Sequence, residues 1–233
     1  YRLGVPIQSQ GTVTSGTDPA SPVVSWVNAS DAADGLYNTG AYTDASANPR
    51  YTANDWIQVD FADARLIGAV GLLQTLQPGS PNWERYQVEL EVNGVQIYQG
   101  DPDGGATALS PGFGRNKYHP LYSPNTTGSL GEARTAAGSV LGAPLSATSV
   151  RVTMQGGQTD QRSAITEIDL WEFSLVGTTT GTSIVDTGRT VGQSYTYFVT
   201  AYDAGGESRL SNHAALKAGD RDDFVSTDIV SDY

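Results

Sequence analysis

Residues 86–98 carry the clearest pattern of hydrophobic and polar positions in the chain. Apolar and polar side chains alternate over residues 86–92, the dipeptide Asn93-Gly94 follows, and a second run rich in apolar side chains covers residues 95–98. Alternation with a period of two indicates a strand with one buried face, and both turn residues tolerate positive φ. The pattern therefore predicts a β-hairpin.

Other segments show the same strand character. One strand is predicted over residues 56–61, and its apolar face carries Ile57, Val59 and Phe61. Further strands or extended pieces are predicted over residues 4–7, 23–27, 66–73, 149–154, 165–171 and 195–202. Polar segments rich in turn-forming residues predict long loops over residues 40–55, 74–84, 100–147 and 155–162.

The composition supports an all-β fold. The chain has 27 Gly and 11 Pro, and only 16% of its residues are charged, which favours many turns. Thr, Val, Tyr and Ser are abundant relative to the helix-favouring residues, as expected for strands. The 38% of hydrophobic residues is enough for a real core, and 233 residues suffice for one large β domain or two smaller ones.

Charge and cysteine content exclude several classes of function. A net charge of −12 repels phosphate backbones and anionic lipids, so we expect no nucleic acid partner. The absence of cysteine excludes disulfides, thiolate metal sites and cysteine nucleophiles. The sequence has no apolar run approaching about 18 residues, so no membrane insertion is predicted. The chain begins at Tyr1 rather than at Met, and we expect an upstream segment to be missing from it.

Residues 31–39 form a candidate calcium-binding turn. Asp34 can offer a carboxylate and Thr39 a hydroxyl, and a tight turn at Asp34-Gly35 can direct backbone carbonyls inward. Hard cations such as calcium take about six to eight such oxygens. A second carboxylate is available from Glu167, near the end of the same predicted domain. Asp-Gly is also a common turn dipeptide, so an ordinary turn is the alternative.

Four short motifs extend this interpretation to the first three quarters of the chain. They are Leu3–Pro6, Ala33-Asp34-Gly35, Trp56–Phe61, and a closing strand with Ala164, Glu167, Ile168 and Leu170. With these motifs in this order, residues 1–173 resemble the discoidin (factor V/VIII type C) family and the related galactose-binding-like carbohydrate-binding modules. The resemblance implies an eight-stranded antiparallel jelly-roll sandwich.

The resemblance also implies a structural Ca2+ that ties an early loop to a late strand. Its implied ligands are the Asp31 and Leu36 carbonyls, the Asp34 carboxylate, the Thr39 hydroxyl or carbonyl, the Thr166 carbonyl and the Glu167 carboxylate. Six oxygens meet the requirement of the ion. Because closing such a long loop costs several kcal/mol of chain entropy, an ion bound only in the folded state stabilises the fold.

A sugar site is implied at the loops at one end of the sandwich. Sugars offer apolar C–H faces and hydroxyl edges, so one aromatic side chain and a few polar groups suffice. The candidates are Tyr51, Gln77, Trp83 and Arg162. The chain departs from sugar-binding relatives, which often have an arginine near Thr75–Gln77 and an aromatic residue in the loop before the last strand. Trp83 is equally explained as a loop anchor, and Gln77 and Arg162 as solvated loop residues.

Residues 174–218 resemble the second half of a fibronectin type III domain, with Tyr195 as the tyrosine whose hydroxyl bonds back to the backbone. About 45 residues cannot hold all seven strands, so an isolated half would expose sheet edges. Three explanations stay open: an upstream part was removed, the first domain is inserted in a host sandwich, or a protein partner completes the sheet by strand addition. Residues 219–233 form an acidic tail.

The sequence carries no catalytic motif, and its two histidines, His119 and His213, are interpreted as surface residues. The resulting prediction is a non-catalytic, calcium-stabilised carbohydrate-binding or adhesion module that binds a glycan or cell-surface polysaccharide. We expect it to be extracellular, on a cell surface or on a virion. The alternative is a structural subunit of a phage tail, virion or surface appendage, whose sandwiches serve assembly.

Overall fold

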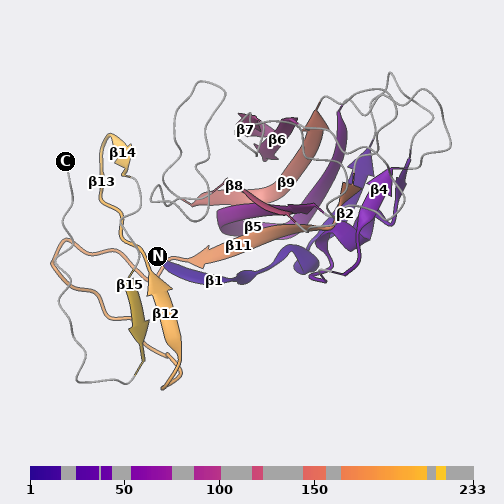
Figure 1. Cartoon of the computed structure of the whole chain (residues 1–233). Helices are drawn as coiled ribbons and strands as arrows, with labels where there is room; N and C mark the ends of the chain where they lie inside the picture. The colour runs from indigo at the N-terminus through magenta and orange to yellow at the C-terminus, as the bar shows by residue number, and fades with distance from the viewer. Residues whose placement is uncertain are drawn as a thin grey trace.

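Strands make up nearly all of the regular structure in the computed structural model, which describes residues 1–16, 25–36, 38–43, 54–74, 87–100, 117–122, 144–155, 164–208 and 214–218 (Figure 1). Two short 3₁₀ helices are present, η1 (Gln8–Gln10) and η2 (Ala29–Ala33). The strands of the first 174 residues are β1 (Arg2–Pro6), β2 (Thr12–Gly16), β3 (Trp26–Val27), β4 (Ala41–Thr43), β5 (Asp55–Gln74), β6 (Gln87–Val92), β7 (Val95–Gly100), β8 (Lys117–Tyr122), β9 (Leu145–Gln155), β10 (Ala164–Ile165) and β11 (Glu167–Ser174). They are followed by β12 (Ser194–Tyr197), β13 (Tyr202–Asp203), β14 (Gly206–Glu207) and β15 (Ala214–Lys217). None of the helices in these ranges is long and apolar enough to cross a membrane.

The long strand β5 joins the two layers of an antiparallel β-sandwich. Its first half pairs with β2 and β9, and β9 pairs in turn with β6 and β6 with β7. Its second half pairs with β11 and β8, and β11 pairs with β1. The pairing with β9 shifts register between Asp60 and Arg65 and resumes over Arg65–Ile67, where the other neighbour of β5 changes from β2 to β11. The sequence predicted two separate strands here, and the structure shows one strand with an irregularity between its halves.

One hydrophobic core lies between these layers. Ile57 and Val59 come from the first half of β5 and Val70 and Leu72 from the second, and all four side chains belong to the same buried cluster. The cluster also holds the apolar faces of β6, β9 and β11, with Leu90, Val152, Ile168 and Leu170. The period-two alternation seen in the sequence therefore corresponds to inward and outward faces, and the predicted all-β sandwich is confirmed.

The predicted hairpin over residues 86–98 is present as β6 and β7. Asn93 and Gly94 adopt φ values of 52° and 73°, which a tight turn between two strands requires. The Asn93 side chain also fixes the hairpin to β9, because its amide donates to the Ser146 carbonyl at 2.8 Å and its Oδ1 accepts the Thr148 N–H at 2.8 Å. The turn residue thus sets both the local bend and the packing on a neighbouring strand.

Three strands of the first 174 residues lie outside the segments for which the sequence pattern predicted strands. β2 lies in the Ser/Thr/Gly-rich start of the chain, β4 in the predicted loop 40–55, and β8 in the predicted loop 100–147. β2 and β8 pair with the long strand β5, and β4 pairs with the two-residue strands β3 and β10. Tertiary pairing, rather than local alternation, therefore defines these strands.

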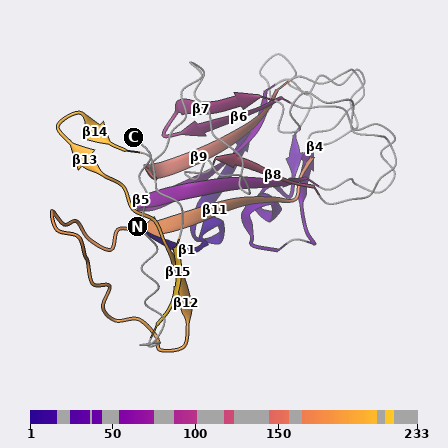
Figure 2. The ribbon, with the colours of Figure 1, turned by 60° about the vertical axis from the view of Figure 1, so that its left-hand side comes forward.

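Residues 174–218 extend the sheet of the sandwich at its β1 edge. Arg2 on β1 pairs with Tyr197 on β12, and β12 pairs with β15 (Figure 2). The amino group of Tyr1 donates to the Phe198 carbonyl and the Phe198 N–H donates to the Tyr1 carbonyl, both at 2.8 Å. β13 and β14 form a separate two-stranded hairpin. The described strands of this segment thus form a sheet extension and a hairpin, and the first residues of the chain hold the extension in place.

Candidate functional site

The candidate turn and the closing strand meet because of a short strand pairing. Asn38, Thr39 and Gly40 lead into β4, and β4 pairs with β10 through Ala41 and Ile165. Glu167 follows β10 by two residues, so this pairing brings it beside the turn. Gly35 has a φ of 82°, a left-handed conformation that glycine adopts without strain, and its N–H lies 3.3 Å from Glu167 Oε1. The structure therefore brings Asp34 and Glu167 to the same place.

Oxygen atoms gather inside the turn. Asp34 Oδ1 accepts the Leu36 N–H at 2.7 Å, and Asp34 Oδ2 lies 2.9 Å from the Thr39 hydroxyl. The same hydroxyl oxygen lies 3.1 Å from the Leu36 carbonyl oxygen. A threonine hydroxyl has one proton, so it can donate to only one of these two oxygens at a time. Three oxygens therefore share a single hydrogen, and a cation at this point would relieve their mutual repulsion.

Glu167 is fully buried beside the turn, with none of its surface exposed. Its Oε1 accepts hydrogen bonds from the Gln8 side-chain amide at 2.8 Å and from the Gly35 N–H at 3.3 Å. Its Oε2 is buried and has no hydrogen-bond partner. Burial raises the pKa of Glu167 to about 7; the two hydrogen bonds oppose this rise, and the nearby Asp169 and Asp34 carboxylates add to it. A buried carboxylate oxygen without a partner is costly unless a positive group faces it.

These residues fit a hard cation in the chemistry of their donors. Asp34 and Glu167 supply carboxylates, Thr39 a hydroxyl and Leu36 a carbonyl, all of them oxygen ligands of the kind that calcium takes. The described residues contain no group of three or more His, Cys, Asp or Glu side chains arranged to hold a metal ion. A cation here would therefore depend on hydroxyl and carbonyl oxygens as much as on carboxylates.

The other predicted ligands, Asp31 and Thr166, lie beside the turn and beside Glu167, respectively. Asp31 is in η2, directly before the turn, and Thr166 is buried between β10 and β11. The backbone of Gly40 is packed so closely against Thr166 that an added Cβ would lie 3.2 Å from its Cα. The predicted sugar-site residues Tyr51, Gln77, Trp83 and Arg162 lie outside the described residues.

Two buried residues next to Glu167 were missed by the sequence prediction. The side-chain amide of Gln8 donates to Glu167 Oε1 and also to Asp169 Oδ1, at 2.8 and 3.1 Å. Gln8 and Asp169 are only 2% and 3% exposed. A signal for Asp169 exists in the sequence, since Glu167 and Asp169 occupy alternate positions of the predicted strand 165–171 and so share one of its faces. That face is buried because η1 and η2 cover it.

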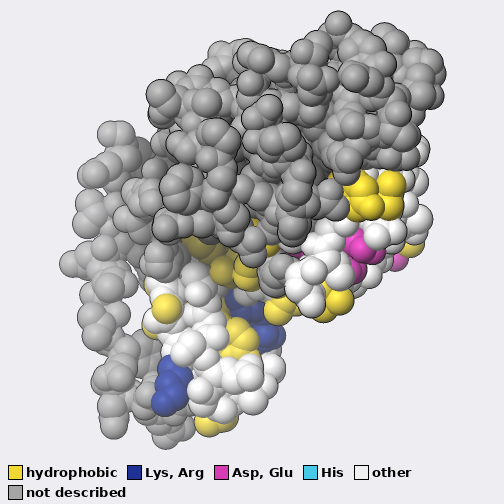
Figure 3. Space-filling view, turned by 45° about the vertical axis from the view of Figure 1, so that its right-hand side comes forward, with side chains coloured by type: hydrophobic (Ala, Val, Ile, Leu, Met, Phe, Trp, Pro, Cys, Tyr) yellow, Lys and Arg dark blue, Asp and Glu magenta, His cyan; other side chains and the backbone are white. Residues whose placement is uncertain are grey.

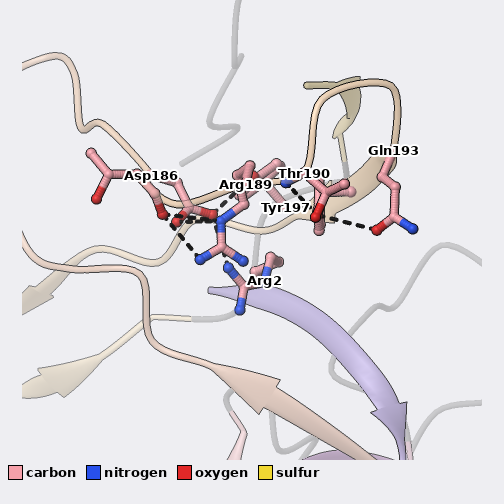
Figure 4. Close-up of polar contacts among 8 residues, drawn as sticks. Arg2, Asp186, Arg189, Thr190, Gln193 and Tyr197 are labelled. Atoms are coloured by element: carbon pink, nitrogen blue, oxygen red, sulfur yellow. Dashed lines mark hydrogen bonds and ion pairs between the residues drawn. The ribbon is translucent and has the colours of Figure 1, made fainter. Parts of the chain in front are cut away.

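A second polar cluster joins residues 174–218 to β1 (Figure 4). Asp186 Oδ2 accepts from Arg2 at 3.0 Å and from the Tyr197 hydroxyl at 2.9 Å, and Asp186 Oδ1 pairs with Arg189 at 3.0 Å. Desolvation acts to raise the pKa of Asp186, but the hydrogen bonds from Tyr197 and Arg2 and the charges of Arg189 and Arg2 together lower it. Every partner of this carboxylate is a donor within the chain, so the cluster is a structural junction.

The Tyr195 hydroxyl contacts the upstream backbone, but this single local contact does not show the fibronectin type III segment that the sequence resemblance implied. The Thr190 N–H donates to this hydroxyl at 3.2 Å, and the hydroxyl lies 3.3 Å from Gln193 Oε1. The Arg2 and Arg189 guanidinium groups lie 5.8 and 5.5 Å from the centre of the Tyr195 ring. The ring therefore connects the 186–193 loop to the same junction.

Several hydrophobic side chains of the described residues are exposed at the surface. On the face shown in Figure 3, basic side chains of the described residues lie near several hydrophobic ones, and acidic side chains lie further along the same face. Most of the large exposed hydrophobic side chains belong to the C-terminal segment: Leu175, Ile184, Val185, Val191, Val199, Tyr202 and Leu216. This part of the chain therefore leaves apolar surface in water.

Comparisons with known proteins show similarity to sugar-binding β-sandwiches of low sequence identity. No protein-family model matches the chain, and no curated protein matches it in sequence. The family 32 CBM of Clostridium perfringens NanJ, solved with galactose, is 17% identical, with a TM-score of 0.44 over 74% of this chain and 100% of that one. A fucolectin from striped bass (Morone saxatilis) serum is 12% identical, with a TM-score of 0.43 over 88% of this chain and 58% of that one. A Streptococcus pneumoniae fucose-binding module, SpX-3, is 11% identical, with a TM-score of 0.41 over 72% of this chain and 98% of that one.

Proposed function

We propose that the chain is a non-catalytic carbohydrate-binding module that acts outside the cell or on a virion surface and binds a glycan or cell-surface polysaccharide. The observation that carries the proposal is the meeting of the Gly35 turn with Glu167, which are 132 residues apart in the sequence. This juxtaposition is what the discoidin-like motifs imply for a galactose-binding-like sandwich. The absence of a catalytic motif in the sequence is in keeping with a binding role.

The proposal includes a structural Ca2+ held between the turn and β11. Asp34, Leu36, Thr39 and Glu167 would hold it, with Asp31 and Thr166 as neighbours that can add carbonyl oxygens. When bound, the ion would supply positive charge that offsets the buried carboxylates and joins two distant segments. Support comes from the buried, unpartnered Oε2 of Glu167 and from the three turn oxygens that share one hydrogen.

The glycan part of the proposal is tested with an array of immobilised glycans, probed with and without EDTA. We expect binding of at least one glycan class and weaker binding after calcium removal. Trp83→Ala is expected to abolish binding. Tyr202→Ala is the matched control, because Tyr202 is a 67% exposed aromatic residue of the C-terminal segment. Failure to bind any glycan, with the fold intact, would contradict this part.

The calcium part is tested by thermal unfolding of a variant with Asp34→Asn and Glu167→Gln, with and without calcium. For the unaltered protein, calcium at 100 times its Kd should stabilise the fold by about 2.7 kcal/mol. The variant should lose this calcium-dependent increment. Glu172→Gln is the matched control, since Glu172 lies on the same strand but pairs with Arg65 at 3.2 Å. An unchanged melting curve of the unaltered protein in EDTA would count against a bound ion.

A structural role in a phage tail, virion or surface appendage is the second candidate. The exposed apolar side chains of residues 175–216 favour it, because such surface is often covered by another protein. A protein partner that completes the C-terminal sheet belongs to the same hypothesis. Sedimentation and electron microscopy distinguish the two roles: ordered polymers without glycan binding would favour assembly, and a monomer that binds glycan would favour adhesion.

A further inference from the structure

We propose that Gln8 is a positioning residue of the cation site: it holds the Glu167 carboxylate so that Oε2 is presented to the ion. This inference rests on the proposed function, because it assumes that a cation binds beside Glu167. Gln8 belongs to none of the motifs that identified the site in the sequence. It is 2% exposed and comes from η1, which directly follows β1.

The contacts of Gln8 fix the orientation of its side-chain amide. Its Oε1 accepts the Leu170 N–H at 3.2 Å, while its Nε2 donates to Glu167 Oε1 and Asp169 Oδ1 at 2.8 and 3.1 Å. In the flipped orientation, the amide nitrogen of Gln8 would face the Leu170 N–H, and its amide oxygen would face the carboxylates of Glu167 and Asp169. Both amide hydrogens and the amide oxygen therefore have a defined partner on β11.

The backbone of η1 holds Gln8 in place for this role. The Ile7 N–H donates to the Leu170 carbonyl at 2.8 Å, and Ile7 is fully buried in the core. Within the short helix, the Gln10 N–H donates to the Ile7 carbonyl at 2.9 Å and the Gly11 N–H donates to the Gln8 carbonyl at 3.1 Å. Gln8 thus approaches β11 from a segment that is itself anchored to β11.

These contacts decide which oxygen of Glu167 remains available. Oε1 receives two donors, Gln8 and Gly35, whereas the buried Oε2 receives none. A carboxylate free to rotate would exchange its two oxygens, and ordering it when the cation binds would cost conformational entropy and weaken binding. With Gln8 in place, the oxygen is already ordered before the ion arrives.

A glutamine suits this position because its amide is neutral. It donates hydrogen bonds to Glu167 and Asp169 without cancelling their negative charge, so the pair still attracts a divalent cation. A lysine or arginine would supply the positive charge itself and compete with the ion. Groups that hydrogen-bond a metal ligand typically change metal affinity about 10–100-fold when they are replaced.

The test compares calcium binding by calorimetry in the unaltered full chain, Gln8→Met and Gln10→Met. Methionine preserves the length of the side chain and removes its hydrogen bonds. We expect Gln8→Met to weaken the calcium Kd about tenfold or more, which reduces the calcium-dependent increment of stability by about 1.4 kcal/mol per factor of ten at saturating calcium. Gln10 lies in the same short helix, is exposed and pairs with Arg65, so Gln10→Met should leave the Kd unchanged.

The outcomes separate a positioning role from a merely structural one. If Gln8→Met destabilises the protein equally with and without calcium and keeps the unaltered Kd, the inference is overturned while the cation site stands. If the unaltered protein binds no calcium, the proposed cation site and this role of Gln8 both fall.

A second measurement decides the case if Gln8→Met does not fold. In an assigned NMR spectrum of the unaltered protein, the Gln8 side-chain amide resonances should shift on calcium addition with the calorimetric midpoint, and those of Gln10 should not. Gln8 resonances that stay unmoved while calcium binds would overturn the inference.

Discussion

Residues 1–173 and residues 174–218 are stabilised in different ways. Among the described residues, every buried hydrophobic side chain except Phe198 belongs to the first region. The second region has most of the large exposed hydrophobic side chains. Its attachment consists of the β1–β12 pairing, the contact of Phe198 with Phe173 at 5.2 Å between ring centres, and the Asp186 junction.

A strand pattern in the sequence does not by itself indicate a separate core. The sequence predicted a strand over residues 195–202, but β12 ends at Tyr197, and the next residue, Phe198, is buried against Phe173, Tyr1, Leu3 and Leu66 of the first region. We therefore expect the first region to keep its structure when the second is detached, and the second to lose its structure when the first unfolds.

The largest expected effect comes from a substitution that creates a cavity in the core of the sandwich. Leu90 is fully buried in the main cluster, so Leu90→Ala should lower the free energy of unfolding by about 2–5 kcal/mol. Val191→Ala, at a side chain that is 79% exposed, should change it by less than about 0.5 kcal/mol. Chemical denaturation measures both. Equal losses would show that the two regions share one core.

The second test detaches the C-terminal segment. Phe198→Ala removes the one buried hydrophobic side chain among the described residues of this segment and should cost about 3 kcal/mol of its docking free energy. Hydrogen exchange should show faster exchange of β12 and β15 amides, while β5 and β9 amides stay protected. Loss of protection throughout the sandwich would contradict the predicted independence of the first region.

The third test uses pH on the first region, in the presence of EDTA. The pKa of Glu167 rises from 4.5 to about 7 in the folded chain, so folding binds a proton between these values. The free energy of unfolding should therefore fall by about 3 kcal/mol as the pH rises from 4.5 to 7, and then become level. Calcium should reverse this trend because it favours the ionised carboxylate. Glu167→Gln is the control, and it should flatten the dependence.

The smallest effect concerns the Asp186 junction, and its pH dependence has the opposite sign. Because the pKa of Asp186 is lowered on folding, its contribution to docking is present above the ordinary carboxyl pKa of 3.8 and is lost as the pH falls through the lower folded value. Asp186→Asn should weaken docking by about 1 kcal/mol at neutral pH, in line with partly exposed ion pairs. Exchange rates of β12 amides report it, and rates equal to those of the unaltered chain would exclude a role for the junction.

The sequence predicted those parts of the fold in which local pattern and tertiary role agree. The β6–β7 hairpin follows from alternation and from Asn93-Gly94, and the buried face of β5 follows from Ile57 and Val59. β2, β4 and β8 could not be predicted because their residues carry little alternation, and they are strands only because β5, β3 and β10 pair with them.

For the candidate site, the sequence motifs were sufficient to predict that Asp34 and Glu167 lie close together. Gln8 and Asp169 were missed because their roles depend on burial, and burial of that face of β11 depends on η1 and η2, two short helices without a hydrophobic pattern. Two acidic residues at alternate positions of one strand, beside the apolar Ile168 and Leu170, are the signal that could have identified Asp169. No comparable local signal exists for Gln8.

The place of β1 in the sheet has a consequence for synthesis on the ribosome. β1 precedes the other described strands in the sequence, yet its two neighbours, β11 and β12, are made only after β2–β10. Until then its two edges have no native partner, and unpaired edges invite association with other chains. During synthesis β1 therefore stays without its native neighbours until β11 has been made.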